Sequence, residues 1–108
     1  MVHNMTIKAG ESESEAVKLD FEGPAATYLP DNWQTTDLLW LGSFDGLRWG
    51  EVRFEGEYIM GPECFRKDVV TWNPARFRGV TWVRLVSRVP QPESCAVRLV
   101  TVPLGPAS

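Results

Sequence analysis

The sequence predicts an all-β domain that folds as a single β-sandwich of about eight short antiparallel strands. Apolar or alternating segments are separated by turn signals at intervals of roughly ten residues, which is typical of sandwiches and small barrels. Eight prolines and nine glycines recur along the 108 residues and leave little room for long helices. Five tryptophans and five phenylalanines can fill a two-sheet core with few residues, which favours the sandwich.

The strands predicted in the first part of the chain follow from short apolar segments that end at turn signals. Residues 5–8 end at an Ala-Gly turn, and residues 15–21 alternate apolar with charged side chains, the period-two pattern of a half-buried strand. Residues 22–24 (Glu-Gly-Pro) are expected to stop that strand, and residues 25–29 form the next one. The apolar run 38–43 predicts a strand that is buried on both faces.

Tight turns and one helical turn organise the middle of the chain. Residues 31–36 are polar and indicate a loop or a single turn of helix. An Asp-Gly dipeptide at 45–46 predicts a hairpin turn, because glycine supplies the positive φ that such turns need. Residues 73–77 place a proline at the first position of a helical turn. The strands expected in this region are 48–54, 57–60 and the β-branched segment 68–72.

The last two strands carry the clearest patterns. Residues 80–87 form the clearest strand segment of the sequence, and residues 95–102 alternate between two faces. We expect one face of the final strand to carry Val97, Leu99 and Thr101 and the other to carry Ala96, Arg98, Val100 and Val102.

The tryptophans divide into two groups. Because Trp40, Trp72 and Trp82 lie within predicted strands, we expect them in the core. Trp33 and Trp49 flank turns, which makes each a candidate for an exposed contact at an interface or in a ligand site.

The length suits one domain and excludes two. We divide the chain into a polar N-terminal arm at 1–15 that leads into the first strand, one sandwich domain at 5–102 and a C-terminal tail at 103–108. The acidic N-terminal region has no apolar signal-peptide core, and no apolar run approaches the roughly twenty residues of a membrane span. We therefore expect a soluble protein that is made in the cytoplasm and has no membrane partner.

The net charge of −3 is unevenly distributed along the chain. Residues 1–36 carry −4, residues 37–75 carry −3 and residues 76–108 carry +4. The acidic total argues against a general nucleic-acid-binding protein, which usually has a basic excess. The asymmetry fits two segments that pair within one fold, and it also fits a head-to-tail contact between subunits.

No residue pattern indicates catalysis, so we expect a protein that is not an enzyme and uses no cofactor. Ser12 and Ser14 lack a nucleophile elbow, and His3 is the only histidine that could serve as their base. A chain this short rarely builds the deep cleft of a glycosidase. One His and two Cys cannot complete the usual zinc set, and the scattered glycines form no phosphate loop.

Cys64 and Cys95 lie in different predicted strands or strand edges. A bridge between them would close a loop of about thirty residues and stabilise the fold by roughly 3 kcal/mol in the chain-entropy model. One pair in a chain with ample apolar residues is not a disulfide framework, so we expect free buried thiols.

The segment 45–49 is the most specific candidate for a ligand site. The Trp49 ring could stack on the apolar face of a sugar while the Asp45 carboxylate accepts hydroxyl hydrogen bonds. The alternative is a hairpin turn whose tryptophan begins the next core strand. Ca²⁺ binding at Asp45 lacks a supporting series of carboxylates. The candidate partner or ligand contacts are Trp33, Asp45, Arg48, Trp49, Arg76, Arg78 and Arg88.

An ordered series of phrases spans about residues 5–102. It begins with Thr-Ile-Lys-Ala-Gly-Glu-Ser-Glu-Ser at 6–14, Leu-Pro-Asp-Asn-Trp at 29–33 and Leu-Trp-Leu-Gly-Ser-Phe-Asp-Gly at 39–46. It continues with Asn-Pro-Ala-Arg-Phe-Arg-Gly-Val at 73–80, Val-Arg-Leu-Val-Ser at 83–87 and the segment 91–102. Together these phrases resemble small proteins of about a hundred residues that are encoded among the structural genes of tailed phages and prophages. The heavy Trp content, the acidic segment 11–15 and the two Cys depart from that pattern.

The resemblance implies a jelly-roll-like sandwich and a non-enzymatic virion protein, above all a capsid decoration or cement protein on the head surface. Its expected partners are the major capsid protein or other virion structural proteins, and it is expected to be a homo-oligomer in the particle. Five arginines of the basic segment could contact capsid carboxylates, namely Arg76, Arg78, Arg84, Arg88 and Arg98. A carbohydrate-binding module with a surface glycan as ligand, and a small tail, neck or fibre accessory domain, stay open as alternatives.

Overall fold

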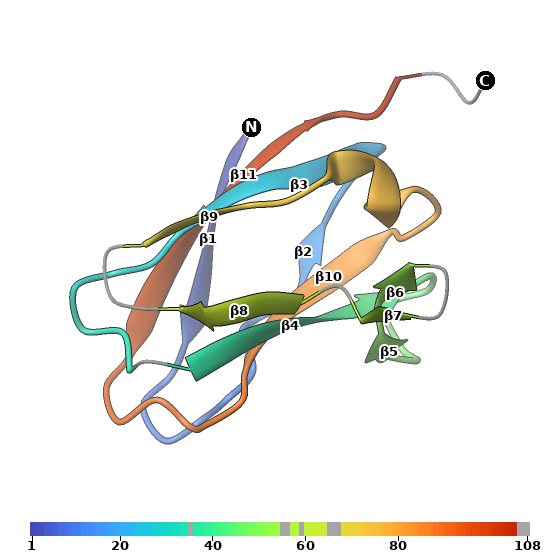
Figure 1. Ribbon diagram of the computed structural model, residues 1–108. Coiled ribbons are helices and arrows are strands. Elements are labelled where there is room, and N and C mark those ends of the chain that lie inside the picture. Colours follow the sequence, from blue (N-terminus) through green and yellow to red (C-terminus); the bar gives the residue numbers. More distant parts are fainter. Residues whose placement is uncertain (35, 55–56, 59, 65–67, 106–108) are drawn as a thin grey trace.

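Two antiparallel sheets pack face to face in the computed structural model, which describes residues 1–34, 36–54, 57–58, 60–64 and 68–105 (Figure 1). The first sheet has the order β1 (Val2–Ile7), β11 (Cys95–Pro103), β3 (Glu22–Tyr28) and β9 (Val69–Thr71). The second has the order β2 (Val17–Lys18), β10 (Trp82–Ser87), β4 (Thr36–Ser43) and β5 (Gly50–Glu51), and β8 (Met60–Cys64) also pairs with β4. A hairpin of β6 (Arg53–Phe54) and β7 (Glu57–Tyr58) and a 3-10 turn, η1 (Pro74–Phe77), complete the described elements.

The prediction of an all-β sandwich is confirmed. The described residues form eleven strands instead of about eight, and four of the eleven contain only two residues. Some of these short strands arise where an irregular residue interrupts a predicted strand. The segment 48–54, for example, is divided between β5 and β6 on either side of Val52. The predicted strand 57–60 includes residue 59, which lies outside the described residues.

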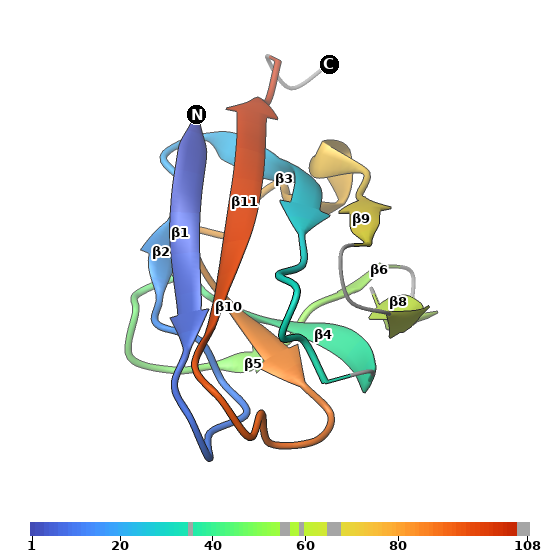
Figure 2. The ribbon, with the colours of Figure 1, turned by 90° about the vertical axis from the view of Figure 1, so that its left-hand side faces the viewer.

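Alternation along the long strands builds the core. β1 and β11 run side by side in opposite directions, with Val2 opposite Val100 and Ile7 opposite Cys95 (Figure 2). The predicted faces of the last strand are confirmed, because Val97, Leu99 and Thr101 are buried. β4 is also buried as predicted at residues 38–40. The side chains that are 0% exposed include Met5, Ile7, Leu38, Phe77, Val83, Leu85, Val97 and Leu99.

The tryptophans follow the prediction only in part. Trp40 is 1% exposed, and its ring makes edge contacts with Trp72 and Phe77, each with centroids 5.4 Å apart. Trp72 packs at the margin of the core and donates its indole N–H to the Thr27 hydroxyl at 3.1 Å. The prediction that Trp82 lies in the core is wrong. Alternation along β10 turns Val83 inward and leaves Trp82 half-buried on the outer face.

The prediction that Trp33 is an exposed contact is also wrong, because this residue is buried. It is 2% exposed and belongs to the core cluster, so it is not a surface contact. A turn closed by the Trp33 N–H and the Pro30 carbonyl at 3.2 Å brings this residue back toward the domain. Polar neighbours in the sequence indicated a surface loop, but tertiary packing decides the position of the ring.

Residues 1–15 belong to the sandwich and do not form an arm that extends from it. Residues 2–7 are β1, and the following loop is bound to the far end of β10 and to the loop beyond it. The Gly10 N–H donates to the Gln91 carbonyl at 2.7 Å, and the Ser14 N–H donates to the Leu85 carbonyl at 2.9 Å. The loop's backbone groups thus find partners within the domain, which a polar composition alone does not reveal.

The turn after β2 lies earlier than predicted. Residues 22–24 were expected to stop a strand, but they begin β3, and Pro24 pairs with Thr101 beside a β-bulge in the register. The reversal instead falls at Asp20 and Phe21, which both have positive φ. Within the described part of the chain, no helix is long and apolar enough to cross a membrane.

Candidate functional site

The Asp45 side chain, a candidate for binding a sugar, forms hydrogen bonds that hold the loop after β4. One oxygen of the Asp45 carboxylate accepts hydrogen bonds from the backbone N–H groups of Leu47 at 2.8 Å and Arg48 at 3.0 Å. The Ser43 hydroxyl donates to the same oxygen at 3.2 Å and accepts the Gly46 N–H at 2.8 Å. Gly46 has a φ of 80°, as a tight turn requires. Asp45 therefore stabilises its own loop, as the hairpin alternative predicts, but Trp49 precedes β5 and does not belong to the core.

These contacts give Asp45 a pH-dependent role in stability. The backbone N–H groups of Arg48 and Leu47 hold the pKa of Asp45 below its ordinary value of 3.8. A carboxyl whose pKa is lowered on folding stabilises the folded state above its unfolded pKa, and this contribution is lost as pH falls through the folded pKa.

We expect Asp45→Asn to be less stable than the wild-type protein at neutral pH, and the difference to shrink as the pH falls below about 3.8. The asparagine side chain keeps an oxygen that can accept the same N–H groups, so the substitution isolates the charge. Urea unfolding at a series of pH values measures the difference. A constant difference between pH 7 and pH 2.5 would show that the charge of Asp45 does not support the loop.

Trp49 is also engaged within the fold. The Arg84 guanidinium lies 4.8 Å from the centroid of the Trp49 ring, and Arg84 forms an ion pair with Glu13 at 3.8 Å. One face of this half-buried ring is therefore occupied by a cation. The neighbouring Arg48 side chain is exposed. The two groups that suggested carbohydrate binding thus have partners within the domain.

A hollow lined by aromatic and aliphatic side chains lies near the start of β10. In Figure 1, β3 begins and β4 ends on the same side of the molecule as the start of β10. The hollow has a volume of about 730 Å³, and its walls include Phe21, Phe44, Arg78, Val80 and Leu104. We call these five residues the aromatic groove. An adjoining hollow of about 350 Å³ shares Phe44, Arg78 and Val80 with it and adds Arg76.

The two phenylalanines of the aromatic groove are almost fully exposed. Phe21 is 92% exposed and Phe44 is 83% exposed, whereas Phe77 in the adjacent 3-10 turn is 0% exposed. Single exposed apolar side chains are common, whereas exposed apolar side chains that gather in one patch mark contact sites. The aromatic groove is therefore the strongest candidate for a contact surface among the described residues.

The backbone at Phe21 is strained. Asp20 has a φ of 47° and Phe21 a φ of 64°, and the Glu22 N–H donates to the Leu19 carbonyl at 2.9 Å, which closes the turn. Positive φ at both central residues characterises the type I′ turn, which strongly prefers Asn-Gly. A bulky residue in this conformation costs on the order of 1–3 kcal/mol. The cost is not offset by burial, because the Phe21 ring faces solvent.

We expect Phe21→Gly to raise the free energy of unfolding by roughly 1 kcal/mol, because glycine adopts positive φ without a steric penalty. In a domain of this size, that gain raises the melting temperature by about 4–8 °C. Thermal unfolding followed by circular dichroism measures the change. Phe44→Gly is the matched control, since Phe44 is similarly exposed but does not have a positive φ. Equal or lower stability of Phe21→Gly relative to the wild type would contradict the assignment of strain.

The structure brings together only some of the residues predicted to form a site. Arg76 and Arg78 are exposed on either side of the buried Phe77, and the Arg78 guanidinium donates to the Gly105 carbonyl at 2.9 Å. Arg78 is part of the aromatic groove, and Arg76 lines the adjoining hollow. Arg88 is exposed just after the opposite end of β10. Phe21 and Phe44 were missed, because the alternation of 15–21 placed Phe21 on the inner face of a strand.

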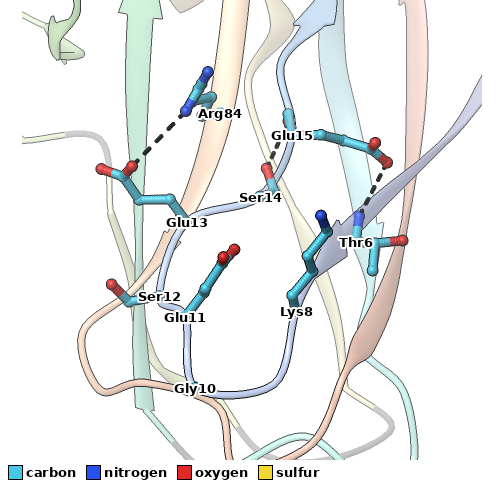
Figure 3. Close-up of a pocket in the computed structure, with 9 residues that line it drawn as sticks. All are labelled: Thr6, Lys8, Gly10, Glu11, Ser12, Glu13, Ser14, Glu15 and Arg84. Carbon is cyan, nitrogen blue, oxygen red and sulfur yellow. Dashed lines mark hydrogen bonds and ion pairs between the residues drawn. The ribbon is translucent and has the colours of Figure 1, made fainter.

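A third hollow, of about 580 Å³, lies beside the acidic loop between β1 and β2 (Figure 3). Its walls include Lys8, Glu11, Glu13 and Glu15, and the Glu15 carboxylate accepts the Thr6 N–H at 3.4 Å. Ser14 is 2% exposed, and its hydroxyl accepts the Leu85 N–H and donates to the Glu15 carbonyl, both at 2.9 Å. Ser14 is therefore a structural residue. Among the described residues, no three His, Cys, Asp or Glu side chains are grouped to hold a metal ion.

Cys95 is a free, buried thiol. Burial and the nearby Glu93 carboxylate raise the pKa of Cys95, which favours the protonated form. Its thiol lies 3.4 Å from the Gln91 side-chain oxygen, within hydrogen-bond distance for sulfur. This residue is packed as part of the core. The Cys64 side chain lies outside the described part of the structure.

Comparisons with known proteins give no family. No protein-family model matches the chain, and no curated protein matches it. Among solved structures, the chain is similar to the Yersinia pseudotuberculosis-derived mitogen, with 13% sequence identity and a TM-score of 0.42. That alignment covers 100% of this chain and 88% of the mitogen chain. A likeness of this degree carries no argument about function.

Proposed function

We propose that this chain is a non-enzymatic structural protein of a tailed-phage particle, specifically a capsid decoration protein, and that its aromatic groove is a protein-contact surface. The exposure of Phe21 and Phe44, 92% and 83%, is the observation that carries the proposal. The ordered series of phrases at 6–14, 29–33, 39–46 and 73–80 supports the assignment to a virion.

The composition of the groove suits a protein partner. Interface cores are enriched in aromatic residues and arginine, and the groove combines Phe21 and Phe44 with Arg78, while Arg76 lies beside it. A strained turn that projects a phenylalanine into solvent is a cost to the free protein. Burial against a partner offsets that cost, because covering a phenylalanine side chain is worth about 1.5–3 kcal/mol.

A decoration protein needs a rigid fold and complementary surfaces rather than an active site. The proposed partners are the major capsid protein or other virion structural proteins, together with further copies of the chain. The proposed location is the outer surface of the capsid. In this position, contacts that bridge neighbouring capsid subunits would oppose the pressure of packaged DNA.

The carbohydrate-binding alternative is less well supported. It relies on the Trp49 ring and the Asp45 carboxylate, which already contact Arg84 and the N–H groups of Leu47 and Arg48. A position in the tail or neck uses the same protein-contact surface. The location of the protein within the particle distinguishes a tail or neck position from a position on the capsid surface.

Particle composition and heat stability test the proposed function. Phage particles produced by cells that carry the gene should contain the chain, and a density map should place it on the capsid. Particles that lack the chain should release their DNA at a lower temperature, and adding the purified protein should restore the release temperature. If particles without the chain were as heat-stable as complete particles, the decoration function would be wrong.

A further inference from the structure

We propose that the aromatic groove binds a second copy of this chain, forming a two-fold symmetric dimer in which each Phe21 enters the groove of the other copy. The inference rests on the proposed function of the groove as a protein-contact surface, and it names the partner. A two-fold interface uses the same patch on both subunits, so that patch must contain both members of each contact.

The shape of the surface meets this requirement. The turn at Asp20 and Phe21 projects an aromatic side chain that is 92% exposed. Phe21 itself forms part of the rim of a hollow of about 730 Å³, whose other apolar walls include Phe44, Val80 and Leu104. A projecting ring and an apolar hollow therefore lie next to each other. A two-fold rotation that relates two copies would place the Phe21 ring of each copy in the hollow of the other.

The charges on the patch also match its own copy. Asp20 precedes Phe21 on the projecting turn and is 71% exposed, and it lines the hollow together with Lys18 and Arg78. The two-fold arrangement brings Asp20 of one copy toward Arg78 of the other, and a guanidinium can bind a carboxylate through two hydrogen bonds. Within one copy, Asp20 contacts Lys18 at 3.7 Å, an exposed ion pair that contributes little and is easily exchanged. A partner of one charge sign would meet a like charge on this patch.

The groove is organised before binding. The Leu104 N–H donates to the Phe21 carbonyl at 2.9 Å, and the Arg78 guanidinium donates to the Gly105 carbonyl at 2.9 Å. These bonds fix both sides of the patch and reduce the entropy lost on association. One turn and one hollow per copy cover less surface than the roughly 800 Å² per partner of a standard interface. We therefore expect a weak dimer that forms reversibly as concentration rises.

Sedimentation of the purified full chain between about 1 μM and about 1 mM tests the inference. The wild-type protein should change from monomer to dimer within this range. Phe21→Gly and Phe44→Ala should each raise the dimer dissociation constant at least about tenfold. Val69→Ala is the control, because Val69 is 52% exposed but lies opposite Tyr28, at the far end of β3 from Phe21.

Charge exchange tests the geometry of the interface. Asp20→Arg and Arg78→Asp should each remain monomeric, because each places like charges in both contacts of its own dimer. An equimolar mixture of the two variants should form a one-to-one heterodimer, since both contacts then pair opposite charges. This recovery upon mixing identifies the second copy as the occupant.

Three results would overturn the inference. The first is that the wild-type protein stays monomeric throughout the concentration range. The second is that Phe21→Gly leaves the dimer dissociation constant unchanged. The third is that the two charge variants fail to associate when they are mixed. If a monomeric protein still binds particles through Phe21, the occupant is a capsid protein, and the inference fails while the proposed function stands. If the dimer forms but particles lack the chain, the proposed function fails instead.

Discussion

Replacing Phe77 with alanine is expected to lower the free energy of unfolding by about 3–5 kcal/mol. Phe77 is 0% exposed, and its ring makes an edge contact with Trp40 at a centroid distance of 5.4 Å. Alanine would remove this contact and leave a cavity in the centre of the core. Because native domains are only marginally stable, the loss is a large fraction of the total stability.

The same substitution is expected to disturb the candidate site. Phe77 anchors η1, and it is flanked directly by Arg76, which lies beside the groove, and by Arg78, which is part of it. The start of η1 also packs closely on β3, where a Cβ atom at Gly23 would lie 2.5 Å from the Pro74 carbonyl oxygen. The turn therefore has a tightly defined position that depends on its one buried side chain.

Urea unfolding of Phe77→Ala and Phe44→Ala provides the measurement with its control. Phe44 is 83% exposed, so its truncation should change the stability by less than about 0.5 kcal/mol. A similar loss of stability in the two variants would contradict the assignment of Phe77 to the core and Phe44 to the surface.

Gln91→Ala is expected to lower the free energy of unfolding by about 2–4 kcal/mol, because it breaks a buried hydrogen-bond network. The Gln91 side chain is 0% exposed. Its oxygen accepts the Gln34 N–H at 2.8 Å, and its amide nitrogen donates to the Ser87 hydroxyl at 2.9 Å. Alanine leaves these partners without their bonds and removes packed volume from the core.

The backbone of Gln91 also holds the acidic loop between β1 and β2, so losing the side-chain network would affect that loop as well. The Gln91 N–H donates to the Glu11 carbonyl at 2.9 Å, and its carbonyl accepts the Gly10 N–H at 2.7 Å. Gln34→Ala is the matched control, since the network uses only the backbone of Gln34. If chemical unfolding gave equal stabilities for the two variants, the proposed importance of the Gln91 side chain would be wrong.

Strand periodicity predicted the buried face of the last strand, but it did not place every residue of the other half-buried strands. The faces of 95–102 and the burial of Trp40 follow directly from apolar alternation and composition. Trp33 and Trp82 could not be placed in this way. The burial of Trp33 depends on tertiary packing around the turn at residues 30–33, and the exposure of Trp82 depends on the register of β10.

The aromatic groove could not be predicted from any local pattern. Phe21, Phe44, Val80 and Leu104 are widely separated in the sequence, and they meet because β10 pairs with β2 and β4 while β3 pairs with β11. The turn at Asp20 and Phe21 lacks the glycine or asparagine that marks a type I′ turn. Arg76 and Arg78 were identified as contact residues from charge alone, and the structure adds the apolar surface beside them.

The most direct measurement is the DNA-release temperature of particles that lack the chain and are then supplied with purified variants. Wild-type protein and Val69→Ala should both restore the release temperature of complete particles. Phe21→Gly should fail to restore it, although we expect this variant to be more stable than the wild type. Restoration by Phe21→Gly equal to that by the wild-type protein would contradict the central claim that the aromatic groove is the contact surface of this protein.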